Sequence, residues 1–176
     1  MEFDFRVTSG KVHLTDPCYD VDMSSKYGAY NVPARNGDWH VEVEHINSWG
    51  FRVKRWRAYH IEENKVNQLN CLSNVLCDND FGVDSGQFGI FDSEIYDGDS
   101  EYDQPGFYRD CCDITLARDL CGVVSKRGFV SSSGFGDGCY DGYASYNANG
   151  ELIKFVIDFI DENEDDNARM FDEDED

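Results

Sequence analysis

The sequence predicts a mainly β, single-domain fold: an antiparallel sandwich or open barrel with one or two short helices. Three observations support this. Apolar and polar residues alternate in many short segments, clusters rich in Asn, Asp and Gly separate those segments, and 40% of the 176 residues are hydrophobic, enough for one core. About eight to ten short strands are expected.

Period-two alternation is clearest in the N-terminal half. Four segments there place apolar side chains at every second position: residues 3–7, 12–14, 27–32 and 39–43. Asn36-Gly37 predicts a hairpin turn, because both residues tolerate positive φ. Residues 51–58 form a further strand, with large or long side chains on both faces.

The C-terminal half mixes strands with two helical candidates. Apolar residues near helical spacing predict a short helix within 65–77, and one or two helical turns fit 107–120. Residues 97–106 are polar and predict a surface loop. Strands are expected at 81–91 (broken at Gly86 and Gly89), 129–131, 139–146 and 152–159, the last two joined by a hairpin turn at 147–150.

Acidic residues outnumber Lys and Arg by 36 to 15, which gives a net charge of −21 and a pI near 4.3. This balance argues against direct nucleic-acid binding, which needs a basic surface. Residues 161–176 hold ten acids and one Arg, so we expect a mobile acidic tail after a globular domain of residues 1–160. The sequence lacks an apolar run of membrane-spanning length and a signal peptide, so no membrane association is expected.

No metal centre or cofactor is expected. The seven Cys are odd in number and irregularly spaced, which is typical of reduced thiols rather than of a zinc knuckle. Segments starting at Asp137 and Asp161 begin like calcium loops but lack the required Glu or Gly. Weak, non-specific binding of divalent cations by the tail stays open.

Three polar clusters occupy expected turns: residues 15–19, residues 82–87 with Phe91-Asp92, and residues 131–141. In a functional interpretation, four carboxylates converge in one cleft, and neutral side chains orient a ligand. The carboxylates are Asp16, Asp84, Asp92 and Asp137, and the neutral groups are Gln87, Ser133 and Tyr140. In the structural alternative, the same Asp side chains cap tight turns by accepting backbone N–H bonds.

A basic strip follows Phe51 and includes Arg52, Lys54, Arg55 and Arg57. Arg55 and Arg57 are candidates for pairing with the phosphate of a small anionic ligand. The alternative is that they balance neighbouring acids. Serine-nucleophile, catalytic-cysteine and phosphate-loop motifs are all missing.

The three clusters, in this order, resemble a family of uncharacterised domains found in bacteria and their phages. The motifs are Asp16-Pro-Cys-Tyr19, Gly82-Val-Asp-Ser-Gly-Gln87 and Ser132-Ser-Gly-Phe-Gly-Asp-Gly-Cys-Tyr140, and the resemblance spans roughly residues 10–160. It implies a compact β-rich domain and supplies no reaction. The matching positions are Asp16, Asp84, Gln87, Asp92, Ser133, Gly134, Gly136, Asp137 and Tyr140.

Two functional hypotheses follow. The first is a small, non-enzymatic acidic protein of phage origin in the bacterial cytoplasm. It would use its negative surface to engage or inhibit a host protein with a basic surface, such as a defence or nucleic-acid enzyme. The alternative is a domain that binds, or hydrolyses, a phosphorylated or nucleotide-like small molecule through the carboxylates of the motif loops.

Overall fold

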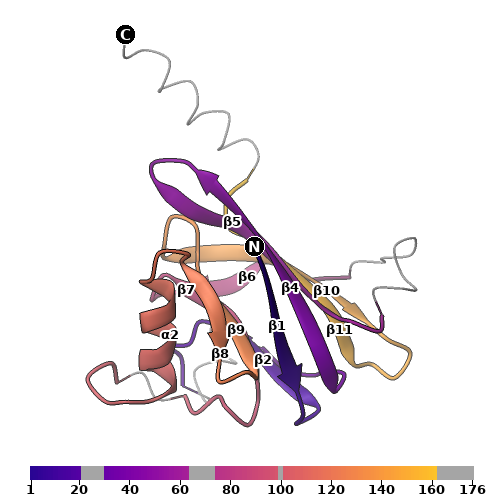
Figure 1. Cartoon of the computed structure of the whole chain (residues 1–176). Coiled ribbons are helices and arrows are strands. Elements are labelled where there is room, and N and C mark those ends of the chain that lie inside the picture. Colours follow the sequence, from indigo (N-terminus) through magenta and orange to yellow (C-terminus); the bar gives the residue numbers. More distant parts are fainter. Residues whose placement is uncertain (21–29, 64–73, 99–100, 162–176) are drawn as a thin grey trace.

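In the computed structural model, which describes residues 1–20, 30–63, 74–98 and 101–161, two antiparallel sheets and one helix make up the regular structure (Figure 1). Sheet A has the strand order β1-β4-β5-β11-β10-β6, and sheet B has the order β3-β2-β7-β9-β8. The strands are β1 (Glu2–Val7), β2 (Lys11–Thr15), β3 (Tyr30–Pro33), β4 (Gly37–Asn47), β5 (Phe51–His60), β6 (Asn74–Val83), β7 (Gln87–Asp92), β8 (Cys121–Val124), β9 (Gly128–Ser132), β10 (Gly138–Tyr146) and β11 (Leu152–Asp158), and the helix is α2 (Phe107–Thr115).

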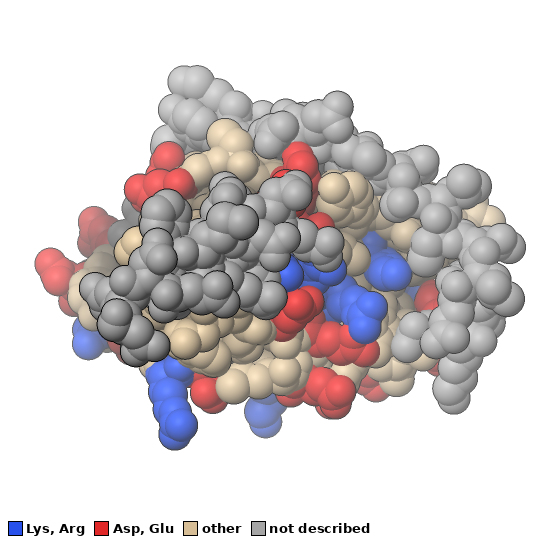
Figure 2. Space-filling view, turned by 90° about the horizontal axis from the view of Figure 1, so that it is seen from above, with Lys and Arg blue, Asp and Glu red and all other residues tan. Residues whose placement is uncertain are grey.

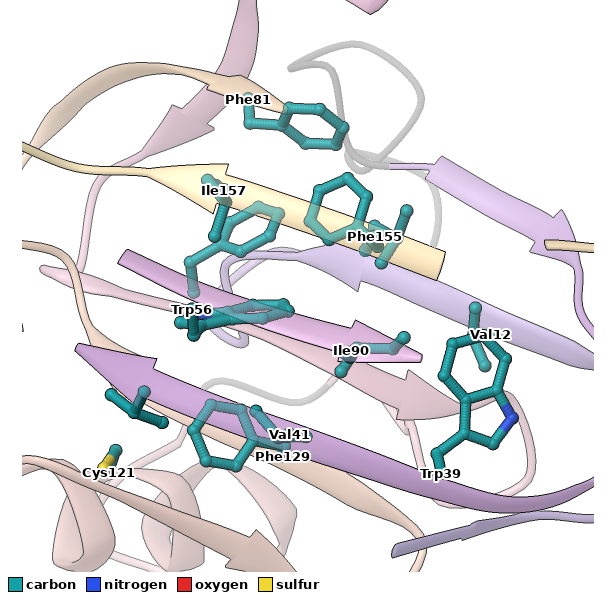
Figure 3. Packing of buried hydrophobic residues seen from close by; sticks show 14 of the residues in the cluster. Val12, Trp39, Val41, Trp56, Phe81, Ile90, Cys121, Phe129, Phe155 and Ile157 are labelled. Atoms are coloured by element: carbon teal, nitrogen blue, oxygen red, sulfur yellow. The ribbon is translucent and has the colours of Figure 1, made fainter. Parts of the chain in front are cut away.

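The predicted mainly β class is confirmed, and the sheets form a sandwich rather than a closed barrel in the described part of the chain. Aromatic rings fill the space between the sheets (Figure 3). Trp56 of sheet A contacts the Phe129 ring of sheet B with centroids 5.5 Å apart, and Phe81 meets Phe88 edge-on at 5.3 Å. All four side chains are fully buried, so this layer supplies much of the apolar burial that drives folding.

The opposite face of sheet B is covered by α2. Phe107 and Cys111 of the helix pack with Phe91 of β7 and Val130 of β9 in a second buried cluster. Because β7 is covered on both faces, all six of its residues are buried. The prediction of helical turns within 107–120 is thereby confirmed.

The chain crosses from one sheet to the other at four described corners: residues 8–10, 34–36, 84–86 and 133–137. The Asn36-Gly37 hairpin prediction is therefore wrong, because β3 and β4 lie in different sheets. Gly37 has φ +131°, and a Cβ there would lie 2.5 Å from Nε2 of His60. This glycine is thus required by a close-packed crossing rather than by a two-residue hairpin.

Two further element predictions need correction. Residues 74–77 belong to strand β6 rather than to a helix, because Val75 and Cys77 pair with β10. Long-range ladder pairing overrides the local helical spacing there. Gly86 lies in the break between β6 and β7, as predicted, whereas Gly89 lies inside β7 without breaking it. The hairpin of β10 and β11 is confirmed.

Three predictions fall wholly or partly outside the described residues: residues 65–73 of the predicted helix, residues 27–29 of a predicted strand, and nearly all of the acidic tail. No helix in the described ranges has the length and apolar character needed to cross a bilayer.

Candidate functional site

The first two sequence motifs meet at the corner of residues 84–86, where the chain passes from β6 to β7. Asp16 follows β2 and is fully buried there. Its carboxylate accepts four hydrogen bonds: from the backbone N–H groups of Cys18 (2.8 Å), Asp84 (2.8 Å) and Ser85 (2.7 Å), and from Oγ of Ser85 (2.6 Å). A charged carboxylate can be buried only when hydrogen bonds replace those it made with water. In return, Asp16 provides the acceptor that the backbone N–H groups of the tight corner need.

The side chains after Asp16 extend the same network. Burial raises the pKa of the Cys18 thiol, and the nearby Asp16 carboxylate raises it further. Burial, together with a hydrogen bond to Asp84, also raises the pKa of Tyr19. Both groups therefore stay protonated at neutral pH, and Cys18 does not supply a thiolate nucleophile.

Gln87 links this corner to α2. Its amide nitrogen donates to Sγ of Cys112 at 3.4 Å and to Oγ of Ser85 at 3.3 Å. Its amide oxygen accepts from Oγ1 of Thr115 at 3.1 Å. Gln87 is 5% exposed, so its polar atoms are used inside the protein rather than presented to a ligand.

The third motif lies against the second. The backbone N–H of Ser133 donates to the carbonyl of Gly86 at 3.0 Å. Within the loop, Oγ of Ser133 and the hydroxyl of Tyr140 both donate to the carbonyl of Gly136, at 2.8 and 2.6 Å. Three motifs distant in the sequence thus meet at one end of the sandwich, as the sequence interpretation required.

Asp92 does not join the other motif residues. It is the last residue of β7 and pairs in register with Val12 at the start of β2, whereas Asp16 follows the end of β2. Its buried carboxylate accepts from the backbone N–H groups of Thr8 (2.6 Å) and Ser9 (3.1 Å). It also pairs with Arg127 at 2.9 Å. The predicted convergence of four aspartates in one cleft is therefore wrong, because Asp92 lies at the other end of β7 from the corner of residues 84–86.

The remaining acids and the arginines are placed differently again. Asp84 and Asp137 are exposed at the end where the motifs meet. Arg55 pairs with Asp158 at 2.7 Å, and Arg57 pairs with Glu42, both on the outer face of sheet A. Their strand, β5, lies three strands away from β6 in that sheet. The two guanidinium groups are thus used in cross-strand pairs and do not face the corner of residues 84–86.

Burial also raises the pKa of two further buried thiols: that of Cys111, and that of Cys121 to about 12. No group of three or more His, Cys, Asp or Glu with metal-binding geometry occurs among the described residues. At this end of the molecule the buried Asp16 carboxylate is fully hydrogen-bonded within the protein, so it stabilises the corner of residues 84–86.

Sequence reasoning missed Arg52 as a member of this region. Arg52 belongs to the basic strip, in which only Arg55 and Arg57 are predicted as phosphate partners. In the structure, Nη1 of Arg52 donates to the carbonyl of Gly134 at 3.2 Å, and its guanidinium lies over the Phe135 ring. Cys112 and Thr115 were also missed, and nothing in the local sequence points to their contact with Gln87.

Comparison with known proteins gave a match to one family model and no match to a curated protein or a solved structure. A family model described as "Protein of unknown function (DUF4241)" matches residues 5–157, which include all three motifs and both sheets. The chain therefore belongs to this family.

Proposed function

We propose that this is a non-enzymatic acidic binding protein of phage origin, which uses its negative surface to engage a bacterial host protein that has a basic surface. The observation that carries the proposal is the use of the buried motif carboxylates. Asp16 and Asp92 are fully buried and are occupied by backbone donors and Arg127. The acids that remain to meet other molecules are those of the surface, in a chain of net charge −21.

The outer face of sheet A supports a binding role. Cross-strand pairs such as Asp4 with His40, Glu42 with Arg57 and Asp158 with Arg55 cover it. Ion pairs at the surface of a protein each add little stability. Figure 2 shows acidic and basic side chains interspersed over one face of the described surface rather than separated into two fields. Recognition by this protein would then depend on position as well as on overall charge.

The alternative, a pocket for a phosphorylated or nucleotide-like ligand, has weaker support. It needs Asp84, Asp137, Arg55 and Arg57 around one ligand, but the two arginines pair along sheet A, away from the motif corner. It also needs polar groups that face outward, whereas Gln87 and Ser133 bond inward.

The test is retention of a partner by the immobilised full chain from a bacterial lysate, followed by purification of that partner and measurement of its Kd against salt. The account expects Kd to rise steeply with ionic strength, because exposed charges are screened. A salt-independent Kd, or no retained partner, would overturn the proposal.

A charge-neutralised chain provides the matched comparison. It carries Asn or Gln in place of the nine acids of residues 162–176. Replacing the same Asp by Glu, and the Glu by Asp, keeps the charge. Only the neutral version is expected to lose affinity, with the melting temperature of both versions unchanged.

A further inference from the structure

Two Asn-Gly pairs occur in the chain, at Asn36-Gly37 and at Asn149-Gly150. Asn-Gly is the dipeptide in which an asparagine most readily loses its amide group, because glycine has no Cβ to shield the backbone nitrogen that attacks. The fold places the first pair at a crossing between the two sheets. It places the second in the turn between β10 and β11, at the edge of the molecule (Figure 1). The surroundings of the two pairs decide which of them is free to react.

Asn36-Gly37 is held by contacts on its side chain and on its backbone. Oδ1 of Asn36 accepts from the backbone N–H of Gly10 at 2.7 Å, and its carbonyl oxygen bonds to Nε2 of His60 at 2.9 Å. A Cβ on Gly37 would lie 2.5 Å from the same Nε2, so His60 crowds the backbone there. The Asn36 carboxamide therefore turns towards the Gly37 nitrogen only when these contacts break.

Asn149-Gly150 lies in open surroundings. Residues 148–150 are all exposed, and no atom lies within 4 Å of a Cβ added to Gly150. Among the described residues, the carboxamide of Asn149 has no hydrogen-bond partner, and only the backbone N–H of this residue is bonded, to Oδ1 of Asn147 at 3.0 Å. The side chain that would react is thus unrestrained by neighbours.

The β10–β11 turn itself is shaped by Asn147. The carbonyl of Asn147 accepts from the backbone N–H of Gly150, and its Oδ1 accepts from those of Asn149 and Glu151, each at 3.0 Å. These bonds must break before the Gly150 nitrogen attacks. None of residues 147–150 is buried, so opening of the turn exposes no part of the core. Local opening costs least free energy in such segments.

We infer that Asn149 is a self-modification site, at which the backbone nitrogen of Gly150 attacks Cγ of Asn149 and water completes a deamidation. The bond from this nitrogen to Cγ forms and the bond from Cγ to Nδ2 breaks. Nδ2 takes up the proton that the Gly150 nitrogen gives up and leaves as ammonia, so that a succinimide ring remains. Water then opens the ring: addition at Cγ gives aspartate, and addition at the main-chain carbonyl carbon gives isoaspartate. Water is the only co-reactant.

The modification changes both the charge and the backbone of the β10–β11 turn. Either product adds one negative charge to a chain that already carries −21. Isoaspartate also inserts a methylene group into the main chain, inside the turn that the bond from the N–H of Asn147 to the carbonyl of Glu151 (2.9 Å) closes. The next residue, Leu152, is fully buried, so the altered backbone leads directly into the core. The inference does not depend on the proposed binding role.

Peptide mapping by mass spectrometry tests this on the full chain, incubated in mildly alkaline buffer and sampled over time. Cleavage after Lys and Arg separates the two sites, because Asn36 and Asn149 fall in different peptides. We expect Asn149 to deamidate at least about tenfold faster than Asn36, since Asn36 must first lose two hydrogen bonds. Asn149→Gln is the matched variant. Its longer side chain does not close the same ring, so position 149 should stay unmodified.

The same measurement in urea separates the effect of the fold from that of the local sequence. Both asparagines precede glycine, so their deamidation rates should converge once the chain is unfolded. Equal rates in the folded chain, or faster loss at Asn36, would overturn the inference. A difference that persists unchanged in urea would show that neighbouring residues, rather than the exposed turn, set the rate, and it would also overturn the inference.

Discussion

Asp16 and Asp92 play the same part at opposite ends of the paired strands β2 and β7. Asp16 follows β2 and accepts backbone N–H groups from the corner that leads into β7. Asp92 ends β7 and accepts backbone N–H groups from the corner that leads into β2. Each strand thus carries the carboxylate that closes the sheet-to-sheet crossing of its neighbour.

Removal of the Asp16 carboxylate should destabilise the fold. Asp16→Ala leaves three backbone N–H groups and Oγ of Ser85 without their buried acceptor, so we expect a loss of at least about 3 kcal/mol in the free energy of unfolding. Urea unfolding measures this loss. Asp137→Asn, at an exposed site, is the control and should change stability by less than about 0.5 kcal/mol. Equal, small losses of stability at both positions would contradict the role of Asp16 in stabilising the corner of residues 84–86.

Asp92 should make stability depend on pH in the acid range. Although burial alone raises the pKa of a carboxyl, hydrogen bonds from Thr8, Glu94 and Arg127 lower the pKa of Asp92 well below its usual value. The unfolded chain therefore binds this proton first, and the stabilisation is complete above about pH 4 and is lost as pH falls below it. Asp92→Asn should lower stability at neutral pH and flatten this acid decline. Unfolding curves from neutral pH downward test both effects, and an unchanged acid slope in the variant would count against the assignment.

His13 should make the stability of the fold depend on pH in a range above that of Asp92. It is buried against Tyr96, with ring centroids 4.4 Å apart, and burial lowers its pKa from 6.5 to about 4. Between these values the unfolded chain binds the proton and the folded chain does not, so stability should fall as pH drops from about 6.5 to about 4. His13→Phe keeps a ring on Tyr96 but should remove this component. Calorimetric melting over that range measures it, and identical pH profiles for the two proteins would be inconsistent with a neutral, buried His13.

Gly89 should not tolerate a side chain. A Cβ at this position would lie 2.4 Å from the Phe129 carbonyl oxygen and 2.3 Å from the Phe91 ring. Gly89→Ala is therefore expected to cost about 2 kcal/mol or more, because β7 is packed on both faces. Gly106→Ala provides the control, since no atom lies within 4 Å of its added Cβ. An unchanged melting temperature for Gly89→Ala would contradict this prediction and would show that β7 can shift to admit the methyl group.

The mainly β class could be predicted from the sequence because alternation, turn residues and composition all favour a sandwich or an open barrel. The corners at which the chain crosses from one sheet to the other were harder to predict. Asn36-Gly37 is a strong hairpin signal locally, but its backbone freedom serves a crossing between sheets that depends on His60, 23 residues beyond Gly37. Gly89 likewise looks like a strand break until the packing of Phe91 and Phe129 is known.

The sequence predicted that the three motifs meet, but it did not predict which of their side chains face solvent. The motifs at Asp16, Asp84 and Ser133 do meet, as glycine-rich turns around a β scaffold suggested. Whether a carboxylate faces solvent or closes a corner depends on register and on the face of a strand, which a single sequence does not specify. The exposure of Trp49 could not be predicted for a similar reason, since it depends on the position of this residue in the β4–β5 turn.

A melting-temperature screen of the full chain against nucleotides, inorganic phosphate and divalent cations tests the central claim most directly. We predict no stabilisation by any of them, because the buried motif groups Asp16, Gln87 and Ser133 are hydrogen-bonded inside the protein. A saturable rise in melting temperature that Asp84→Asn or Asp137→Asn abolishes, without destabilising the free protein, would contradict the account and reinstate a small-ligand site.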